Sequence, residues 1–336
     1  MAKGSICLII SRMKVMSVMV TTMVLLLGMY QMENIISTHC INYRQTVNKR
    51  QYYTFDNQMD LNNTITSKYI INCANLDQVQ IKTERIRRGQ FKTTDVGIFN
   101  GQEVAVKYFF DKIANRKKES EIRQFLFMKE IFMLNQLDHP GLIKMLGYCV
   151  KPLHEHNSRY MSESLSITAV YEYGEVFNVT TLSLSVEQRI KHVLNLADLL
   201  LYLENSPLGS LRIDDFKSGH FLMVNNVMKL IDFDYFNNDE PSCTTKCVYN
   251  LTCYKPTNSG NIKCGPGTSC DKGLCIGYNA RINMVRVNDA LFRFLLQEQF
   301  FPSNMRMHIS NLESLLNKHK IDALQLMRDL RQLKIN

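Results

Sequence analysis

The order of apolar and polar residues predicts a strand-rich lobe in the first half of the chain. Residues 96–99 and 103–110 form apolar-rich runs typical of strands, and Asn100-Gly101 between them is a strong signal for a hairpin turn. Apolar residues then recur at helical spacing over residues 119–137, which predicts an amphipathic helix. Two further strands are expected over residues 142–149 and 167–173, the second of which leads to a hinge.

A helical half is expected after the hinge. Ser185-Val-Glu-Gln188 has the capping-box pattern that opens a helix, and apolar residues line one face of this helix down to Glu204. Near the C-terminus, Ser310-Asn-Leu-Glu313 predicts a second capping box, and the leucine-rich segments after it are expected to be packing helices. Coiled-coil pairing is a weaker alternative because the heptads are too few.

Between these helical segments, a short hairpin is flanked by two acids. Residues 221–224 and 227–231 are apolar runs joined by Asn225-Asn226, and asparagine tolerates the positive φ that a tight turn requires. Asp215 precedes this hairpin and Asp232 ends it, seventeen residues later. A loop acid, a hairpin and a second acid form the layout of a protein-kinase catalytic loop and metal loop. The alternative is a plain β-hairpin with two capping acids.

In the kinase layout each of these groups has a defined task. Asp215 would accept the proton of the substrate hydroxyl, Asp232 would hold the metal that bridges the ATP phosphates, and Lys217 would neutralise charge on the transferred phosphoryl group. Lys107 ends a Val-Ala-Val-Lys strand whose lysine pairs with the α- and β-phosphates, and Glu130 stands where its orienting glutamate is expected. Taken singly, a strand lysine and a helix glutamate are equally well explained as solvent-facing side chains.

The phosphate-binding loop is the most degraded of these elements. Gly89 is retained, whereas protein kinases usually carry two or three glycines in this loop. Backbone amides near Gly89 could still approach a phosphate group, but less closely.

The N-terminus carries a membrane-targeting pattern. Residues 15–32 form an uncharged run of eighteen residues, just long enough at ~1.5 Å each to cross a ~30 Å hydrocarbon layer. Lys3, Arg12 and Lys14 precede the run, which predicts a cytoplasmic N-terminus and a translocated remainder. A cleaved signal peptide is the close competitor. Residues 33–82 are polar and are expected to form a lumenal stem.

The cysteines agree with an oxidising compartment. Six of them fall within thirty-three turn-rich residues without histidines, which predicts a disulfide-stapled segment: Cys243, Cys247, Cys253, Cys264, Cys270 and Cys275. A zinc site is the weaker alternative because no Cys-x-x-Cys pair occurs there. Cys40, Cys73 and Cys149 leave an odd count, so one thiol is expected to stay free, pair between chains or lie buried.

Glycosylation sequons and composition add smaller constraints. Asn62, Asn178 and Asn250 each begin an Asn-x-Thr sequon, which is individually weak evidence for a lumenal chain. Apolar content of 45% and charged content of 21% describe an ordinary globular protein, and the net charge of +9 is a mild basic bias. The sequence lacks zinc-finger spacing, an RNP-like strand and a basic repeat, so we expect no nucleic-acid partner.

Several motifs together resemble a known family. The segments concerned are Ser206-Pro-Leu-Gly-Ser, Asp215-Phe-Lys, Lys229-Leu-Ile-Asp-Phe-Asp234, the Cys270-x4-Cys275 pair, and Asn279-Ala-Arg-Ile-Asn283 with the later Phe292-Arg-Phe. Together they resemble the secretory-pathway tyrosine kinases called vertebrate lonesome kinase, and divergent kinases related to them. The resemblance covers residues 85–335. It implies a kinase fold, ATP with Mg²⁺ or Mn²⁺, a Golgi or extracellular setting, and lumenal or extracellular protein substrates with tyrosine as the favoured acceptor.

Three departures from the kinase pattern matter. The usual His-Arg-Asp is Ile213-Asp214-Asp215, so the histidine that braces the catalytic loop is absent. His220 replaces the metal-binding asparagine, and imidazole is a better ligand for Mn²⁺ than for Mg²⁺. The cysteine-rich segment 243–275 replaces an ordinary activation loop, and no Ala-Pro-Glu motif follows, which favours a loop held by disulfides rather than by phosphorylation.

These patterns predict an α+β, bilobal kinase-like fold with a disulfide-rich insertion in the activation-segment region. Residues 1–32 are expected to be a signal-anchor or signal peptide, 33–82 a stem, and 83–335 the kinase domain. The leading hypothesis is a secretory-pathway protein kinase. The alternatives are a pseudokinase that acts as a binding module, and a cysteine-rich interaction knob carried by the kinase portion.

Overall fold

The computed structural model describes residues 69–89, 91–109, 117–152, 165–177, 183–243, 264 and 268–333. All of them fall within one compact unit, residues 63–336. In chain order its elements are η3 (Leu76–Gln78), β1 (Gln80–Arg88), β2 (Lys92–Phe99), β3 (Gln102–Phe109), α2 (Lys117–Gln136), β4 (Met145–Pro152), β5 (Leu165–Glu172), β6 (Glu175–Val176), α3 (Val186–Glu204), β7 (Arg212–Ile213), η4 (Ser218–His220), β8 (Phe221–Val224), β9 (Val227–Leu230), β10 (Phe236–Asn237), β11 (Ser269–Asp271), β12 (Leu274–Ile276), α4 (Tyr278–Val287), η5 (Asn288–Phe292), α5 (Arg293–Leu295), η6 (Glu298–Phe300), α6 (Ser303–Asn317) and α7 (Ala323–Arg331). The segment η5 is a π-helical turn that joins α4 to α5 without a break.

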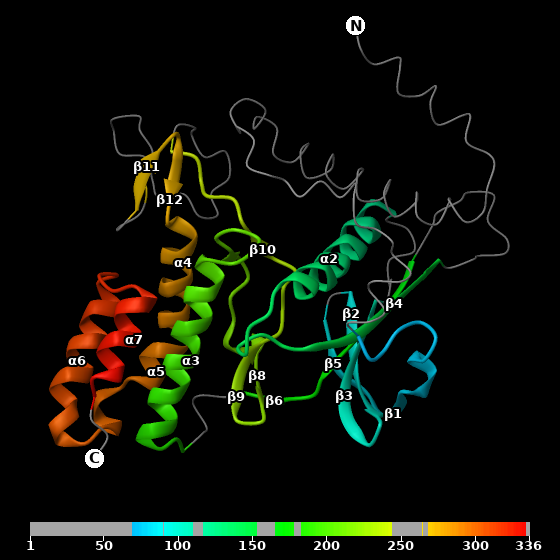
Figure 1. The fold of residues 1–336 in the computed structure, drawn as a ribbon, viewed down its shortest axis with the longest axis horizontal. Helices are drawn as coiled ribbons and strands as arrows, with labels where there is room; N and C mark the ends of the chain where they lie inside the picture. Colours follow the sequence, from blue (N-terminus) through cyan, green and yellow to red (C-terminus); the bar gives the residue numbers. More distant parts are fainter. Residues whose placement is uncertain are drawn as a thin grey trace, which may run out of the picture. The chain divides into compact units, whose positions relative to one another are not determined.

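A five-stranded antiparallel sheet dominates the first half of the unit (Figure 1). Its strand order is β1-β2-β3-β5-β4, and α2 packs against β4 and β5. The predicted hairpin joins β2 to β3, because Asn100 (φ 49°) and Gly101 (φ 76°) adopt the left-handed conformation that a tight hairpin turn requires. The sheet and its helix therefore form the strand-rich lobe that the sequence predicts.

The chain leaves this sheet close to the hairpin that lies between Asp215 and Asp232. Strands β6, β8 and β9 form a small sheet, and the β8–β9 turn has positive φ at both Asn225 and Asn226, as predicted. Gly174 lies against this sheet, where an added Cβ would approach Val224 Cγ2 to 2.6 Å and Met223 O to 2.9 Å. A larger residue at position 174 would therefore push the hinge away from the hairpin.

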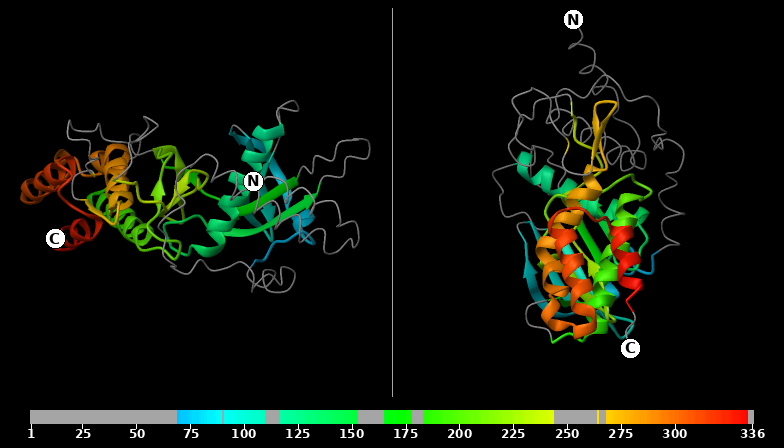
Figure 2. Two further views of the ribbon diagram at one scale, coloured as in Figure 1. Left: turned by 90° about the horizontal axis from the view of Figure 1, so that it is seen from above. Right: turned by 90° about the vertical axis from the view of Figure 1, so that its left-hand side faces the viewer.

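Helices α3 to α7 make up the second half of the unit (Figures 1 and 2). Helix α3 packs against α4, α5 and α7. The predicted capping box at its start is confirmed, since Gln188 N donates to Ser185 Oγ (3.2 Å) and Ser185 N donates to Gln188 Oε1 (2.9 Å). Such a cap stabilises a helix by ~1 kcal/mol.

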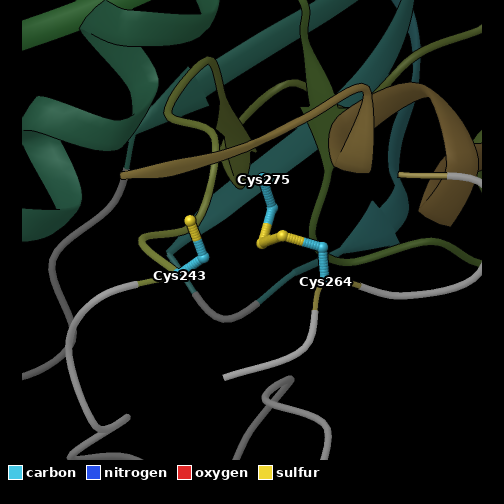
Figure 3. A group of neighbouring side chains, drawn as sticks. All are labelled: Cys243, Cys264 and Cys275. Carbon is cyan, nitrogen blue, oxygen red and sulfur yellow. A yellow bond between two sulfur atoms is a disulfide. The ribbon is translucent and has the colours of Figure 1, made fainter. Parts of the chain in front are cut away.

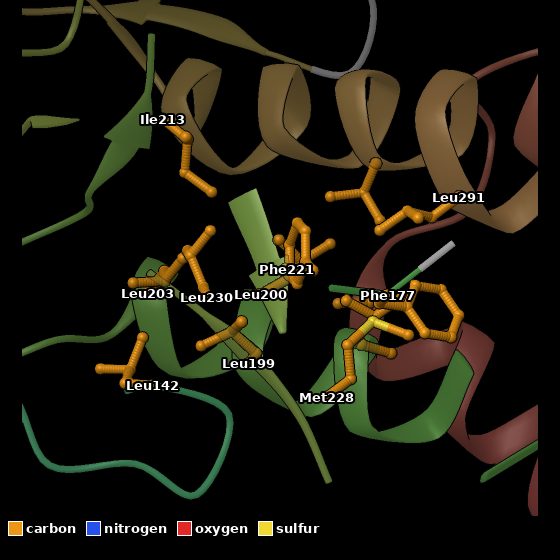
Figure 4. Packing of buried hydrophobic residues seen from close by; sticks show 14 of the residues in the cluster. Leu142, Phe177, Leu199, Leu200, Leu203, Ile213, Phe221, Met228, Leu230 and Leu291 are labelled. Atoms are coloured by element: carbon orange, nitrogen blue, oxygen red, sulfur yellow. The ribbon is translucent and has the colours of Figure 1, made fainter. Parts of the chain in front are cut away.

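One apolar core runs through both halves. It includes Phe127 of α2, Leu142, Leu203 of α3, Leu230 of β9 and Leu291, all nearly inaccessible to solvent. Figure 4 shows part of this core between α3, α4 and the β8–β9 hairpin. Backbone bonds reinforce the junction, because Ile143 N donates to Leu230 O (3.0 Å) and Leu230 N donates to Gly141 O (2.8 Å). Strand β9, which leads to Asp232, is thus hydrogen-bonded to residues 141–143 and packs against α3.

One expectation for the C-terminal helices is wrong. Ser310 and Glu313 lie inside α6, which begins at Ser303, so they do not form a capping box. Burial of Met305 and Ile309 extends this helix toward its N-terminus, and this tertiary packing outweighs the local capping signal. The cap that the sequence did not reveal is Asp322, whose side chain accepts from Gln325 N (2.7 Å) at the start of α7.

The segment before β1 already packs on the sheet. A disulfide joins Cys73 to Cys149 of β4, which decides the pairing of two of the cysteines left open above. Ile71 is buried and pairs with Gly147, where an added Cβ would lie only 1.8 Å from Ile71 O. Gly147 is therefore required for this segment to approach β4.

Other expectations fall outside the described residues. These are the sequons at Asn62, Asn178 and Asn250, the cysteines Cys247 and Cys253, and the apolar run 15–32. Within the part of the chain that the structure describes, no helix combines the length and apolar character needed to cross a membrane.

Candidate active site

The lysine of β3 and the glutamate of α2 meet as the sequence predicts. Lys107 Nζ lies 2.6 Å from Glu130 Oε1, and Tyr171 of β5 donates its hydroxyl to the same oxygen at 2.8 Å. Glu130 is completely buried. Although burial raises the pKa of Glu130, the ammonium groups of Lys107 and Lys92 lower it to about 2. The glutamate is therefore ionised and orients Lys107; the role of this pair toward a nucleotide remains a prediction.

A second lysine, Lys92 at the start of β2, enters the same cluster. Its Nζ lies 2.7 Å from Glu130 Oε2, 2.6 Å from Asp234 Oδ1 and 3.8 Å from Asp232 Oδ1. Burial lowers the pKa of Lys92, but the carboxylates of Glu130, Asp234 and Asp232 outweigh burial and raise it overall. Lys92 is therefore a charged, buried group that joins the sheet, α2 and the metal loop.

Three acids gather around these lysines. The carboxylate oxygens of Glu130, Asp232 and Asp234 lie within 4.8 Å of one another. Burial and the neighbouring acids Glu130 and Asp232 raise the pKa of Asp234 to about 7, although Lys92 opposes the shift. Asp232 is more accessible, with 30% of its side chain exposed, so it offers a carboxylate to the solvent side of the cluster.

The predicted catalytic acid lies on the loop between β7 and η4. Asp215 is partly exposed, and Lys217 Nζ donates to its Oδ2 at 2.7 Å. His220 Nε2 lies 3.5 Å from Asp232 Oδ2, so both proposed metal ligands are adjacent. Burial lowers the pKa of the His220 imidazole, although Asp232 and Asp215 oppose the shift. The neutral imidazole that burial favours is the form that binds a metal.

The histidine that usually braces the catalytic loop is absent, as the sequence indicates, and residues of α4 brace the loop instead. Asn283 accepts from Ile213 N (2.9 Å) and donates to Leu211 O (2.8 Å), and its side chain is buried. Asn279, also buried, donates to Ser210 O (2.8 Å). Arg286 donates to Ile213 O. Two amides and a guanidinium therefore hold the backbone that the absent histidine would support.

Asp214 replaces the arginine of the usual loop and has arginine partners of its own. Arg212 Nε lies 2.6 Å from Asp214 Oδ1, and Arg286 Nη1 lies 3.4 Å from the same oxygen. These two arginines are therefore paired with Asp214 rather than left to bind a phosphorylated activation loop. This geometry agrees with a segment held by disulfides.

We expect Asn283→Ala to loosen the catalytic loop. The change removes two buried hydrogen bonds and leaves Ile213 N and Leu211 O without a partner, which costs about 2–4 kcal/mol of unfolding free energy. Urea unfolding of this variant beside Asn238→Ala provides the measurement. Asn238 also donates to a backbone carbonyl, but on an exposed site, so its loss should cost less than about 1 kcal/mol. Equal losses in the two variants would contradict a bracing role for Asn283.

Disulfides tie the segment after the metal loop to α4. Cys243 pairs with Cys270, and Cys264 pairs with Cys275 (the latter bond is drawn in Figure 3). Cys270 and Cys275 face each other in the β11–β12 hairpin, directly before α4. The sulfurs of Cys243, Cys264 and Cys275 are close because two disulfides lie side by side, so these cysteines do not offer the thiolates of a zinc site.

Glu240 makes a further link to α4. Its carboxylate accepts from Gly277 N (3.2 Å) and Asn279 N (3.1 Å), at the first residues of α4. A carboxylate near these amide groups also favours the helix N-terminus. The helix that braces the catalytic loop is therefore itself fixed by Glu240 and the two disulfides.

Comparison with known proteins identifies kinases as similar chains. No family model matches the chain. It is 29% identical to human "Extracellular tyrosine-protein kinase PKDCC" over 179 residues, which are 52% of this chain and 33% of that protein. It is 32% identical to a probable serine/threonine-protein kinase of Dictyostelium discoideum over 140 residues (41% of this chain, 8% of that protein). A probable receptor-like protein kinase of Arabidopsis thaliana is 31% identical over 144 residues (40% and 15%).

These relatives and the observed order of elements agree. The chain has a kinase-like fold with a disulfide-rich segment. The resemblance to secretory-pathway tyrosine kinases is confirmed by the similarity to the human extracellular enzyme. This kinase-like chain spans a third or less of the length of the three relatives named above.

The residues present fit a divalent cation and nucleotide phosphates. Asp232 and Asp234 offer oxygen ligands within 4.8 Å of each other, and Mg²⁺ and Mn²⁺ favour such oxygens. Glu130 holds Lys92, Lys107 and Tyr171, whereas Asp234 shares Lys92 with it and Asp232 is partly exposed. The two aspartates are therefore the better metal ligands, with His220 beside Asp232. Lys107 would supply a cation for nucleotide phosphates. The N–H of Gly89 is instead engaged within the turn before β2, where it donates to Lys92 O (2.8 Å), so it is not offered to a phosphate.

Sequence inspection missed two members of this cluster, although both left a signal. In the motif Gly-x-Gly-x-x-Gly the third glycine follows the second by three residues, and Lys92 follows Gly89 by three. Asp234 stands where the Asp-Phe-Gly motif has its glycine. These two departures from glycine place a cation beside an anion, a complementarity that is already visible in the sequence.

Proposed function

We propose that this chain is a protein kinase that transfers the γ-phosphate of ATP to a protein hydroxyl, with tyrosine as the favoured acceptor. The observation that carries the proposal is the convergence of Lys107, Glu130 and Asp232 from three separate segments on one partly buried cluster. The similar chains are kinases, and the human one is an extracellular tyrosine kinase, which supports the acceptor class.

The chain's own residues supply positioning and electrostatics. Lys107, held by Glu130, would neutralise the α- and β-phosphates, and Asp215 would accept the proton of the incoming hydroxyl. Lys217, 2.7 Å from Asp215, would move its ammonium from that carboxylate to the transferred phosphoryl group. A divalent cation on Asp232 and Asp234, when bound, supplies further charge neutralisation between the phosphates.

We also propose that the chain works in the secretory pathway or outside the cell. The Cys73–Cys149, Cys243–Cys270 and Cys264–Cys275 disulfides support an oxidising compartment, and the human relative is extracellular. Residues 15–32 are the candidate anchor or signal segment. The substrates of the protein would then be lumenal or extracellular proteins.

The test uses full-length protein expressed in animal cells and purified from the secretory fraction. A shift in mobility on glycosidase treatment checks the compartment. The protein is then incubated with ATP, Mg²⁺ or Mn²⁺ and a library of secreted proteins, beside Asp232→Asn, and phosphotyrosine is mapped by mass spectrometry. We expect incorporation by the wild type with at least one metal, and about 10²–10³-fold less by Asp232→Asn.

The competing hypothesis is a non-catalytic binding module. Asp234 in place of glycine, His220 in place of asparagine and the sparse glycine loop favour it. Nucleotide binding without phosphate transfer to any library protein would support the binding module. Absence of nucleotide binding with either metal would overturn the kinase proposal.

A further inference from the structure

Lys92 places a positive charge between the two aspartates of the metal loop. Its ammonium lies between Asp234 Oδ1 (2.6 Å) and Asp232 Oδ1 (3.8 Å), the same two acids that fit a divalent cation. Only 11% of its side chain is exposed. The ammonium is also 5.3 Å from the ring centroid of Phe91 and 5.5 Å from that of Phe127, distances typical of cation–π contacts. The ammonium therefore lies within the acid cluster rather than at its edge.

Lys92 and Lys107 share one carboxylate. Lys107 takes Glu130 Oε1 and Lys92 takes Glu130 Oε2, at 2.6 Å and 2.7 Å. Both ammonium groups are therefore held side by side by a single buried anchor. Their other contacts differ, because Lys107 reaches Ile231 O (3.4 Å), whereas Lys92 reaches the two aspartates.

The net charge of the cluster changes when a metal binds, and the partner of the Lys92 ammonium should change with it. With every group ionised, three carboxylates and two ammonium groups leave one negative charge. A divalent cation on Asp232 and Asp234 would change this to one positive charge and would repel the Lys92 ammonium from both acids. Glu130 would still hold the ammonium beside Lys107, where a bound nucleotide phosphate would be an anion that it could neutralise.

We propose that Lys92 has two successive roles: it neutralises Asp232 and Asp234 until a divalent cation takes them, and it then binds nucleotide phosphate together with Lys107. This inference rests on the proposed kinase function and adds a second phosphate-binding residue, supplied by the third-glycine position of the loop. Lys92 and the metal compete for the same acids, and Lys92 and Lys107 cooperate on the phosphates.

The competition predicts opposite effects of one substitution. Lys92→Met keeps the length and removes the charge, so it should tighten binding of Mn²⁺ alone by about tenfold because a like charge a few ångströms away is lost. The same variant should bind the non-hydrolysable analogue AMP-PNP with Mg²⁺ about tenfold or more weakly, because a phosphate-binding cation is lost. Free Mn²⁺ measured by electron paramagnetic resonance and calorimetry with AMP-PNP give the two affinities.

Two variants serve as matched controls. Lys107→Met should weaken AMP-PNP binding without tightening Mn²⁺ binding, because the contacts of Lys107 in the described site are to Glu130, Tyr171 and Ile231 rather than to the aspartates. Lys82→Met should change neither affinity, since Lys82 pairs with Glu103 on the exposed face of the sheet. Lys92→Gln, a smaller change in polarity, replaces Lys92→Met if the latter does not fold.

The outcomes separate this inference from the proposed function. Wild-type protein that binds no nucleotide overturns the proposed function and, with it, the inference. Wild-type binding with both affinities unchanged in Lys92→Met overturns the inference alone. Weaker binding of both Mn²⁺ and AMP-PNP, with a lower melting temperature, also overturns it, because Lys92 would then be only a structural clamp.

Discussion

Replacing Asp215 by Asn should lower the rate of phosphate transfer by roughly 10²–10⁴-fold and leave nucleotide affinity nearly unchanged. In the proposed mechanism the carboxylate positions and deprotonates the acceptor hydroxyl, and an amide cannot accept that proton. Asp215 lies outside the Lys92–Lys107–Glu130 cluster and pairs with Lys217, so its loss leaves in place the groups expected to hold the α- and β-phosphates. Single-turnover transfer and AMP-PNP calorimetry measure the two quantities.

Asp232→Asn and Asp215→Asn should differ in nucleotide affinity. Asp232 belongs to the acid cluster, so its amide variant should lose metal-dependent nucleotide binding together with transfer. Asp239→Asn, an exposed acid a few residues later in the chain, is the matched control and should retain both. Transfer by Asp215→Asn at the wild-type rate would show that Asp215 is not the general base.

Glu130→Gln should destabilise the protein by about 3–5 kcal/mol. The substitution removes the only full negative charge that Lys107 contacts among the described residues, and it leaves two buried ammonium groups sharing a neutral amide. Glu103→Gln is a closely matched control, because Lys82 also lies 2.6 Å from Glu103, but in an exposed pair. Exposed pairs contribute little to stability because solvent screens them, so urea unfolding should show a clear difference between the two variants. Equal destabilisation would mean that burial of Glu130 adds nothing.

The pH dependence of unfolding provides a second test of the role of Glu130. Because the pKa of Glu130 is lowered to about 2 in the folded protein, this group stabilises the fold above its unfolded pKa, and the contribution is lost as pH falls through about 2. The wild type should therefore lose more unfolding free energy than Glu130→Gln between roughly pH 5 and pH 2. Parallel curves over this range would contradict the lowered pKa.

The contacts from α4 explain how this divergent kinase-like chain keeps the backbone of its catalytic loop in place. The usual loop histidine is replaced by Ile213, which is buried in the core, and the polar support comes instead from Asn279, Asn283 and Arg286. These residues lie about seventy positions later in the chain, on the helix that follows the disulfide hairpin. The stability of the catalytic loop should therefore depend on the disulfides around β11 and β12. These bonds would order the segment that phosphorylation orders in an ordinary activation loop.

The sequence by itself determined the features that depend on neighbouring residues. Asn100-Gly101 and Asn225-Asn226 specify tight turns because their own backbones accept positive φ, and Ser185 with Gln188 starts α3 through bonds within one helical turn. The periodicity of residues 119–137 likewise located α2 to within two residues at its start. The order of these local elements was enough to predict the kinase-like arrangement.

Only the tertiary structure decided the features that depend on distant partners. Lys92 and Asp234 are 142 residues apart, and a lone lysine in a sequence is best interpreted as solvated until the fold shows the acids that justify its burial. The disulfide partners of Cys243 and Cys264 could not be chosen from spacing, because six cysteines allow fifteen connectivities. The pattern at Ser310 met the local rule for a cap and failed, because packing of Met305 and Ile309 had already extended the helix. Local rules fix turns and helix starts, whereas burial of charge, disulfide pairing and helix length are set by contacts that form only when distant segments meet.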